Sequence, residues 1–214
     1  MKRGILTVVS GFSGAGKGTL MKALLNRYDN YAVSVSATTR KPRAGEENGR
    51  EYFFLTREEF ESMIGQNALI EWAQYVGNYY GTPRASVEEQ LAAGIDVILE
   101  IEMQGGMHVK QLFPDCLMVF VAPPSAAVLR DRLTGRGTET PEQIEKRLAR
   151  AAEEADYMEQ YEYLAVNDDL DVCVEQLHRI IQEPSYREPF RTANRLDFIR
   201  ELKTELAAFR KKQE

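Results

Sequence analysis

A glycine-rich segment close to the amino terminus restricts the fold more than any other part of this chain. Gly11 and Gly16 have four residues between them, and Lys17 follows directly. The segment comes straight after the apolar run Ile5–Val9. Glycine backbone amides can turn inward around a phosphate, the lysine can reach its outer oxygens, and a helix that begins there adds its positive end. The order of strand, loop and helix therefore favours a phosphate-binding loop over an ordinary glycine-rich turn.

One position departs from the usual form of this motif, in which a serine or threonine follows the lysine. Gly18 occupies that position, and Thr19 comes one residue later. A hydroxyl is therefore still present at the end of the loop.

Composition limits the class of protein and its partners. With 214 residues, the chain is long enough for one domain with a substantial core. Aspartate and glutamate total 33 against 27 lysines and arginines, so the net charge of −6 gives little support for a nucleic-acid or anionic-membrane partner. Cys116 and Cys173 have neither metal-ligand nor disulfide spacing, and the first apolar run is too short for a signal peptide or a membrane span. We therefore expect a cytoplasmic protein with buried, reduced thiols, and we leave open whether it forms a homo-oligomer.

Strand-like runs that are almost continuously apolar alternate with helical patterns along most of the chain. Such runs are typical of a parallel sheet that is covered on both faces, and right-handed crossovers then produce a three-layer α/β core. The predicted strands are Ile5–Val9, Ile95–Leu99, Leu117–Ala122 and Tyr163–Val166. The predicted helices are Lys17–Arg27, Met107–Leu112, a helix that begins after Ser125, and Leu170–Gln182.

Residues 36–84 interrupt this alternation, because they are polar, rich in aromatic residues and contain several glycines. Tyr52–Leu55 is strand-like, and Thr56–Glu59 has the sequence of a capping box at the start of a short helix. We expect residues 36–84 to form a small insertion of mixed β structure.

Residues 125–152 are rich in arginine and predict a helical lid. Thr140–Gln143 combines a capping box with a proline at the first helical position, and the glycine-flanked turn Gly135–Gly137 precedes it. The tail, residues 183–214, predicts a helix that packs on the core or on a second copy of the chain. Its apolar positions share one helical face and are Leu196, Ile199, Leu202, Leu206 and Phe209.

Three groups of side chains are suited to bind, respectively, a second phosphate group, a base or metal ion, and a transferring phosphate. Arg40 and Arg43 supply planar forks for phosphate oxygens, with tyrosine hydroxyls at Tyr52 and Tyr80 as neutral donors. Glu71 is an acid inside an apolar run, and it can accept hydrogen bonds from a base. Two further acids, Glu100 and Glu102, lie at the end of a predicted strand. Because they alternate with Ile101, they point to the same face, where they can also hold magnesium or its waters. The lid arginines Arg132, Arg136 and Arg147 could be a solvated helix face, but their concentration in an acidic chain favours a clamp on a transferring phosphate.

At this point the chain resembles the guanylate kinase family, which transfers a phosphoryl group from ATP to GMP. The strings that carry the resemblance are Gly11–Thr19, Val35–Glu46, Gly77–Thr82, Glu100–Gly105, Ala122–Ser125, Gly135–Thr138 and Val166–Asp169. Together they run through most of the chain as far as about Gln182. The resemblance implies a P-loop kinase core with a GMP-binding insertion at 36–84 and a lid at 125–152.

The resemblance also implies roles for individual residues of this sequence. GMP would be bound by Ser36, Arg40, Arg43, Tyr52, Glu71, Tyr80, Thr82 and Glu102. ATP would be bound by Gly11, Ser13, Gly14, Ala15, Gly16, Lys17, Gly18, Thr19 and Asn167. The catalytic residues would be Lys17, Arg132, Arg136 and Arg147. Magnesium would lie near Thr19 and Glu100, bound directly or through water.

Two other functions stay open at the level of sequence. A related phosphotransferase with a different acceptor, such as a ribose bisphosphate, would keep the phosphate loop but not the paired acids Glu71 and Glu102. A non-catalytic binding module of the same fold would be expected to lose the phosphate loop or the lid arginines, and this chain has both.

Overall fold

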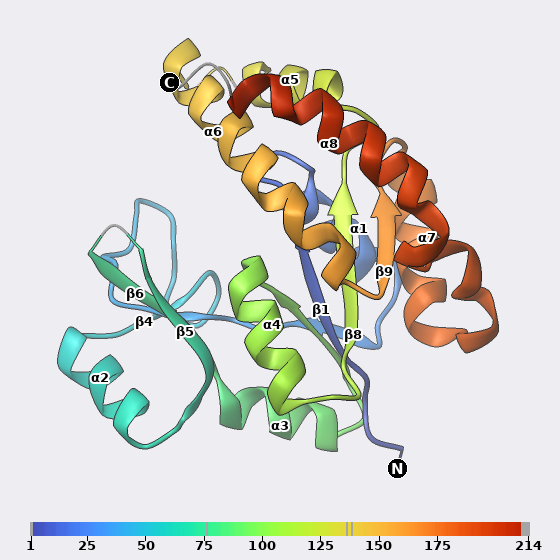
Figure 1. The fold of residues 1–214 in the computed structure, drawn as a ribbon. Coiled ribbons are helices and arrows are strands. Elements are labelled where there is room, and N and C mark those ends of the chain that lie inside the picture. The colour runs from blue at the N-terminus through green and yellow to red at the C-terminus, as the bar shows by residue number, and fades with distance from the viewer. Residues whose placement is uncertain (1, 76, 136, 138, 211–214) are drawn as a thin grey trace. The chain divides into compact units, whose positions relative to one another are not determined.

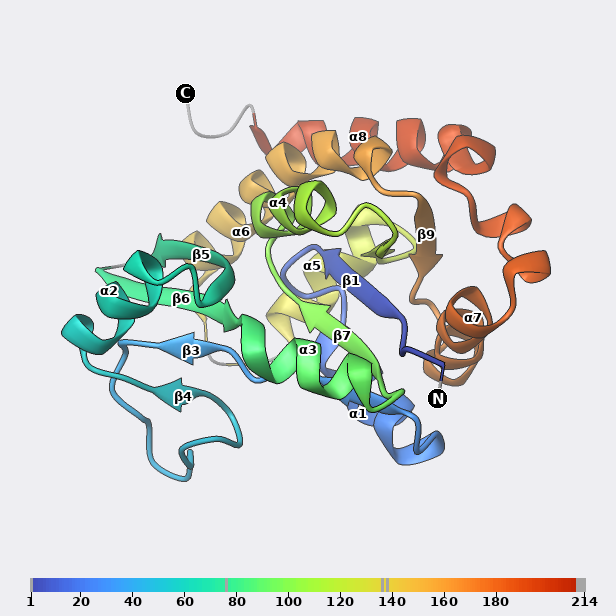
Figure 2. The same ribbon diagram turned by 90° about the horizontal axis from the view of Figure 1, so that it is seen from below.

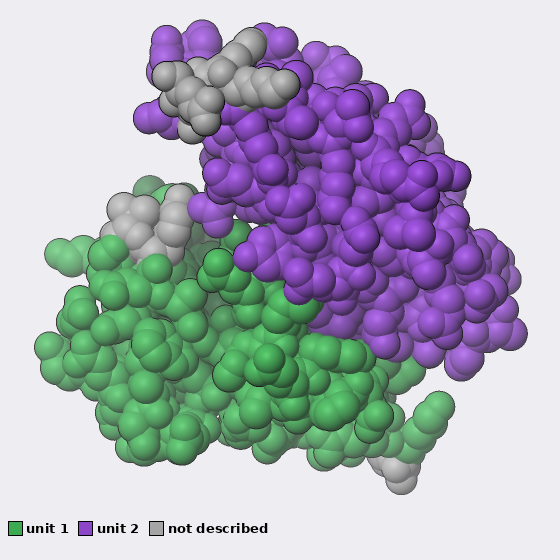
Figure 3. Space-filling model, in the orientation of Figure 1, with its two compact units in different colours: residues 1–8, 30–116 green, residues 9–29, 117–214 purple. Residues whose placement is uncertain are grey.

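The computed structural model describes residues 2–75, 77–135, 137 and 139–210. A five-stranded parallel sheet has the strand order β2-β7-β1-β8-β9, and a separate four-stranded sheet has the order β4-β3-β6-β5 (Figure 1). Helices alternate with the strands of the larger sheet along the chain, so the predicted α/β fold is confirmed. The chain divides into unit 1, residues 1–8 and 30–116, and unit 2, residues 9–29 and 117–214 (Figure 3). Strand β1 (Leu6–Gly11) contributes residues to both units.

In unit 1, short polar contacts join the strands of the larger sheet. Strand β2 (Tyr31–Val33) runs parallel to β7 (Asp96–Glu100). The backbone N–H of Val97 donates to the carbonyl oxygen of Ile5 at 2.9 Å. The buried carboxylate of Asp96 accepts from the backbone N–H of Ile5 at 2.7 Å and from the Asn30 side chain at 2.8 Å. Strand β7 begins and ends one residue later than the apolar run Ile95–Leu99 that predicts it.

The second sheet of unit 1 lies within the predicted insertion and has mixed strand directions (Figure 2). Strand β6 pairs antiparallel with both of its neighbours, β3 and β5, whereas β3 and β4 pair in parallel. Helix α2 (Arg57–Gly65) begins at the predicted capping box, and its Phe60 is buried with Ala37 and Leu69 in a small apolar core. The strands are β3 (Ala37–Thr38), β4 (Phe53–Phe54), β5 (Leu69–Tyr75) and β6 (Asn78–Pro83).

Two further helices of unit 1 flank strand β7 in the sequence. Helix α3 (Arg84–Ala92) has no counterpart in the sequence prediction. Helix α4 (Met103–Leu112) begins before the predicted start at Met107, because burial of Met103 and Gly106 outweighs the low helix propensity of adjacent glycines.

Unit 2 contains the elements whose bounds the sequence predicts best. Strands β8 and β9 pair in parallel, with Val119 opposite Tyr163. Helices α1 and α7 lie against each other in the same unit. The predicted bounds are confirmed for α1 (Lys17–Arg27), β8 (Leu117–Ala122), β9 (Tyr163–Val166) and α7 (Leu170–Gln182).

The arginine-rich segment of unit 2 forms two helices, α5 (Ala126–Thr134) and α6 (Pro141–Glu154). The Ser125 hydroxyl caps α5, and the predicted capping box of Thr140 and Gln143 begins α6. In both cases the side chain satisfies a backbone N–H that the first helical turn leaves without a partner.

The tail follows a run of short 3₁₀ turns and ends in helix α8 (Leu196–Arg210), which lies along α6 (Figures 1 and 2). Ile199, Leu202 and Leu206 are buried, so the apolar face packs within unit 2. Among the described residues, no helix combines the length and apolarity needed to cross a membrane. The 3₁₀ turns are η1 (Ala155–Gln160), η2 (Pro184–Tyr186), η3 (Glu188–Phe190) and η4 (Thr192–Arg195).

Candidate active site

The glycine-rich loop joins β1 to α1 in unit 2, and two of its glycines are required by their surroundings. A Cβ atom at Gly11 would lie 2.1 Å from the carbonyl oxygen of Val121, which is closer than atoms can approach. Gly16 has a φ of +89°, and a Cβ there would lie 2.6 Å from Nδ2 of Asn167. Any other residue at either position would deform the loop.

The buried Asn167 and the half-buried Arg132 contact the backbone of this loop. The side-chain amide of Asn167 donates to the carbonyl oxygen of Ala15 at 2.8 Å. Arg132, from α5, donates to the Asn167 carbonyl oxygen at 2.8 Å and to that of Ala15 at 3.4 Å. Asn167 is 5% exposed, so its hydrogen bond to the loop is shielded from water. Arg132 and Asn167, which the resemblance assigns to catalysis and to ATP, thus contact the loop backbone itself.

The first turn of α1 lies at the end of the loop with donors suited to anions. The N-cap residue of α1 is Gly16, which has no side chain that could cap the helix. Lys17 Nζ donates to the carbonyl oxygens of Gly11 at 2.6 Å and Phe12 at 3.2 Å. Gly18 and Thr19 are exposed. The positive end of a helix, a lysine and an accessible hydroxyl therefore occur together, as phosphate binding requires.

Arg147, on α6, also reaches the loop. Its guanidinium lies 2.7 Å from the Glu139 carboxylate and donates to the Ser13 hydroxyl at 3.3 Å. The Glu139 side chain is only 12% exposed, so it holds Arg147 from a largely buried position. Glu139 has no predicted role, although it lies just before the α6 capping box. Arg136, the third predicted lid arginine, lies outside the described residues.

Unit 1 contains a buried acid, Glu71, on β5. Its side chain accepts a hydrogen bond from the Thr82 hydroxyl of β6 through Oε1 at 2.6 Å, and the residue is 9% exposed. Burial raises the pKa of the Glu71 carboxyl above its ordinary value, and the Thr82 hydrogen bond partly opposes this rise. Glu71 therefore combines a desolvated carboxylate with a fixed orientation.

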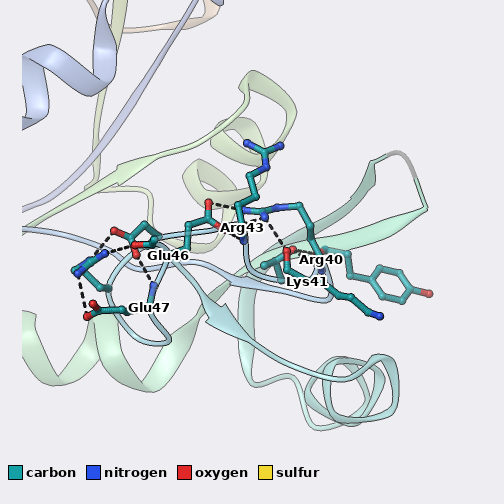
Figure 4. A network of polar contacts seen from close by, with 10 residues as sticks. Arg40, Lys41, Arg43, Glu46 and Glu47 are labelled. Atoms are coloured by element: carbon teal, nitrogen blue, oxygen red, sulfur yellow. Dashed lines mark hydrogen bonds and ion pairs between the residues drawn. The ribbon is translucent and has the colours of Figure 1, made fainter.

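A second group in unit 1 centres on Arg40 (Figure 4). Its guanidinium forms two hydrogen bonds to the Glu46 carboxylate, at 2.9 and 3.0 Å, and lies 5.3 Å from the centre of the Tyr52 ring. Glu46 also accepts from the backbone N–H of Arg43 at 2.7 Å. The Arg40 side chain, followed by the Arg43 backbone, lowers the pKa of the Glu46 carboxyl. Tyr80 lies edge-on to Tyr52, with ring centres 6.0 Å apart.

Arg40, Tyr52 and Tyr80, which the sequence predicts to act together, lie close to one another. Glu46, which the sequence does not predict as a site residue, orients the Arg40 guanidinium. Glu46 belongs to a motif string of the resemblance, yet the sequence analysis gives it no role. The signal that could have identified it is an acid placed on the far side of a glycine turn from Arg40. The side chain of Arg43 points away from the network, so only its backbone takes part (Figure 4).

The remaining candidates of unit 1 lie at the ends of elements. Ser36 precedes β3 and is half-buried, and Glu100 is the last residue of β7. Glu102 is exposed and occupies the N-cap position of α4. Because β7 ends at Glu100, the strand alternation used to place both acids on one face does not extend to Glu102.

The structure sorts the candidates by unit. All eight predicted GMP residues, Ser36, Arg40, Arg43, Tyr52, Glu71, Tyr80, Thr82 and Glu102, belong to unit 1. The phosphate loop, Asn167, Arg132 and Arg147 belong to unit 2. Of the two predicted magnesium residues, Glu100 is in unit 1 and Thr19 is in unit 2.

Comparison with known proteins gives consistent results. The family model described as guanylate kinase matches residues 3–184. A guanylate kinase of Synechocystis sp. is 51% identical over 181 residues, which cover 85% of this chain and 95% of that protein. A guanylate kinase of Desulfitobacterium hafniense is 52% identical over 178 residues, or 83% of this chain and 89% of that protein. The crystal structure of guanylate kinase from Anaplasma phagocytophilum has a TM-score of 0.68 at 31% identity, and the match covers 87% of this chain and 90% of that one.

Proposed function

The chain belongs to the guanylate kinase family, and from this premise we propose that it transfers the γ-phosphoryl group of ATP to GMP, producing ADP and GDP. The observation that carries the proposal within the chain is the buried Glu71–Thr82 pair. Guanine presents two adjacent donors, the ring N–H and the exocyclic amine, to which one carboxylate can bond. A desolvated acceptor of fixed orientation suits that pattern and rejects adenine, whose matching ring nitrogen carries a lone pair.

The other acceptor contacts follow from the chemistry of unit 1. Arg40 and Arg43 would bind the GMP phosphate, and the hydroxyls of Tyr52 and Tyr80 would donate to it. The two bonds from Glu46 orient the Arg40 guanidinium before substrate arrives, which reduces the entropy lost on binding. Ser36, Thr82 and Glu102 would complete the polar edge of the base site.

The donor site would be the loop Gly11–Thr19 with its supports. The γ-phosphate oxygens would replace the loop carbonyls as partners of Lys17 and would compete with Glu139 for Arg147. Arg132, which donates to the Ala15 carbonyl oxygen of the loop, would contact the transferring phosphoryl group. Arg136 is proposed as a third contact to the charge that develops on the transferring group.

No general base is needed for this reaction. The second pKa of a phosphate monoester is about 6, so at neutral pH the GMP phosphate already carries a nucleophilic oxygen. The residues therefore have to align two anions, neutralise developing charge and exclude water as a competing acceptor.

Magnesium is proposed as the metal cofactor, and the donor atoms of the chain suit it. Thr19 offers an exposed hydroxyl and Glu100 a carboxylate, both hard oxygen ligands of the kind that Mg²⁺ prefers. Among the described residues, no cluster of three or more His, Cys, Asp or Glu side chains could hold a metal, so nucleotide phosphates and water would complete the coordination. When bound, the metal would neutralise charge on the nucleotide phosphates.

A coupled ADP-release assay with ATP and a panel of acceptors tests the proposal. The panel contains GMP, AMP, CMP, UMP and a ribose bisphosphate, with ATP alone as the control for hydrolysis. We expect rapid ADP release with GMP and little with the others. Turnover with the ribose bisphosphate in place of GMP would indicate a different phosphotransferase, and absence of turnover despite GMP binding would indicate a binding module.

A further inference from the structure

Gly105, the third residue of α4, lies against the side chain of Glu71 in unit 1. A Cβ atom at Gly105 would lie 2.9 Å from Oε2 of Glu71 and 3.4 Å from its Cδ. The other oxygen of the same carboxylate, Oε1, accepts the hydrogen bond of Thr82 at 2.6 Å. The carboxylate therefore lies between a hydroxyl from β6 on one side and the first turn of α4 on the other.

The backbone at Gly105 does not itself require glycine. Its φ lies outside the left-handed region, unlike those of Gly11, Gly14 and Gly16. Inside a helix, glycine is also less favourable than alanine, because it loses more conformational freedom on folding. Alanine at this position would therefore stabilise the helix more than glycine does. The reason for glycine has to come from the neighbouring strand β5, which carries Glu71.

We propose that Gly105 is a specificity-determining residue, which leaves free the space that the Glu71 carboxylate occupies when it reads guanine. The inference rests on the proposed function and adds to it the position that sets the location of the base-reading acid. Because Gly105 belongs to the first turn of α4, the missing side chain also lets the carboxylate approach the positive end of that helix.

An alanine at position 105 is expected to move the acid and leave the fold intact. The atom that a Cβ would overlap is the free end of a flexible side chain, so the carboxylate can turn aside without a shift of the backbone. Thr82 would then no longer hold it in the orientation that matches the two donors of guanine. The substitution therefore separates base recognition from folding.

The test compares Gly105→Ala with Gly65→Ala, which introduces the same methyl group at the end of α2, where a Cβ meets nothing within 4 Å. Steady-state kinetics with GMP, AMP and ATP and thermal unfolding are measured for both. Gly105→Ala is expected to lower kcat/KM for GMP by about tenfold or more, the factor that corresponds to one lost charge-assisted hydrogen bond. The KM for ATP and the unfolding midpoint should hold, and Gly65→Ala should behave like the unsubstituted protein.

A double-mutant cycle with Glu71→Ala shows whether Gly105 acts through that residue. Once the carboxylate is removed, Gly105→Ala is expected to cause no further loss of GMP turnover. An equal loss in both backgrounds, or an unchanged GMP-to-AMP ratio in the single variant, would overturn the inference. If Gly105→Ala alone does not fold, recovery of folding in the double variant supports the contact with Glu71, and its failure to recover contradicts it. The unsubstituted protein tests the proposed function separately, because its own GMP turnover does not depend on either variant.

Discussion

Burial shapes the chemistry of Glu71 more than any charged partner does. The carboxyl has a raised pKa, so between its ordinary value of 4.5 and the raised value the folded chain binds more protons than the unfolded chain. Under these conditions stability rises as pH falls. Above the raised pKa, folding has to hold a buried charge, and that cost is fully present at neutral pH if the raised pKa lies below it.

Glu71→Gln is therefore expected to make the ligand-free protein more stable at neutral pH. Glutamine keeps an oxygen that can accept from Thr82 and carries no charge. The difference in free energy of unfolding between the two forms should shrink as pH falls and vanish below about 4.5, where the carboxyl is protonated in both states. Urea titrations at a series of pH values measure this difference. A gap that stays constant with pH would show that Glu71 is not buried as a charge.

The same substitution should impair the proposed reaction. Glu71→Gln replaces an accepting oxygen with a donor, so transition-state stabilisation for GMP should fall by about 1.5–3 kcal/mol, the worth of a charge-assisted hydrogen bond. The ratio of kcat/KM for GMP to that for AMP measures the effect. Glu58→Gln, at an exposed position of α2, is the matched control. An unchanged ratio would remove Glu71 from the base site.

Lys17→Met is expected to lower turnover by about 10²–10³-fold, the range for loss of one preorganised donor to developing charge. Methionine keeps a similar volume but cannot donate to phosphate. GMP affinity by calorimetry should hardly change, because Lys17 is predicted to contact only the ATP phosphates. Lys22→Met, at an exposed position of α1, serves as the control. Comparable turnover in both variants would contradict the assignment of the loop.

At the scale of elements, helix α8 lies outside the family match yet contacts both lid helices. The family model ends at residue 184, and α8 packs on α6 and α5. Lys203 pairs with Glu159 at 2.6 Å, and Arg210 pairs with Asp156 at 2.7 Å. These exposed pairs add little stability by themselves, so the buried apolar face provides most of the attachment.

One polar contact of α8 reaches the start of α5. The Glu205 carboxylate accepts from the backbone N–H of Ala126 at 2.7 Å, which satisfies a donor of the first helical turn. Glu205→Ala is expected to lower the free energy of unfolding by about 0.5–2 kcal/mol, the usual cost of losing such a cap. Turnover at saturating substrate should change little, since the buried apolar face of α8 packs within unit 2 and none of the predicted site residues lies on this helix. Urea unfolding and kinetics test this against Glu201→Ala, an exposed site on the same helix; loss of turnover in a folded Glu205→Ala variant would show that the tail contributes to the site.

At the scale of the whole molecule, each unit contains one buried cysteine, Cys116 in unit 1 and Cys173 in unit 2. Burial raises the pKa of the Cys173 thiol to about 12, with a small opposing effect from Arg132. Strand β1 supplies residues to both units. Unfolding of either unit would therefore disrupt a strand that the other unit shares.

We therefore expect both thiols to resist labelling in the native protein and to become reactive together. The unsubstituted chain is labelled with a thiol reagent across a urea series, and the two cysteine peptides are analysed by mass spectrometry. The extent of labelling of each peptide measures the unfolding of its unit. Both peptides should be modified with one midpoint, the mark of a cooperative transition. Modification of one cysteine at a lower urea concentration would show that the units unfold separately.

Local patterns predict an element well when its start and end signals lie within a few residues. The capping boxes at Thr56 and Thr140 begin helices as predicted, and the apolar run of β8 has the predicted bounds. The sequence does not individually predict strands β2, β3, β5 and β6 or helix α3. Strand β2 is only three residues long, and in β5 the pattern misleads because the acid Glu71 is buried whereas the apolar Trp72 is exposed. The contacts of Arg40 with Glu46 and of Arg147 with Glu139 were also missed, because side-chain pairing depends on how loops close.

The sequence by itself determined the phosphate loop, the family, and the alternation of most core strands and helices. These features are local, since glycine spacing, capping residues and apolar runs act over a few neighbouring positions. Only the tertiary structure decided that Glu71 is buried, that Thr82 orients one of its oxygens, and that Gly105 leaves room for the other. The physical reason is that desolvation and steric contact depend on distance in space, and α4 comes from a part of the chain separate from the neighbouring strands β5 and β6.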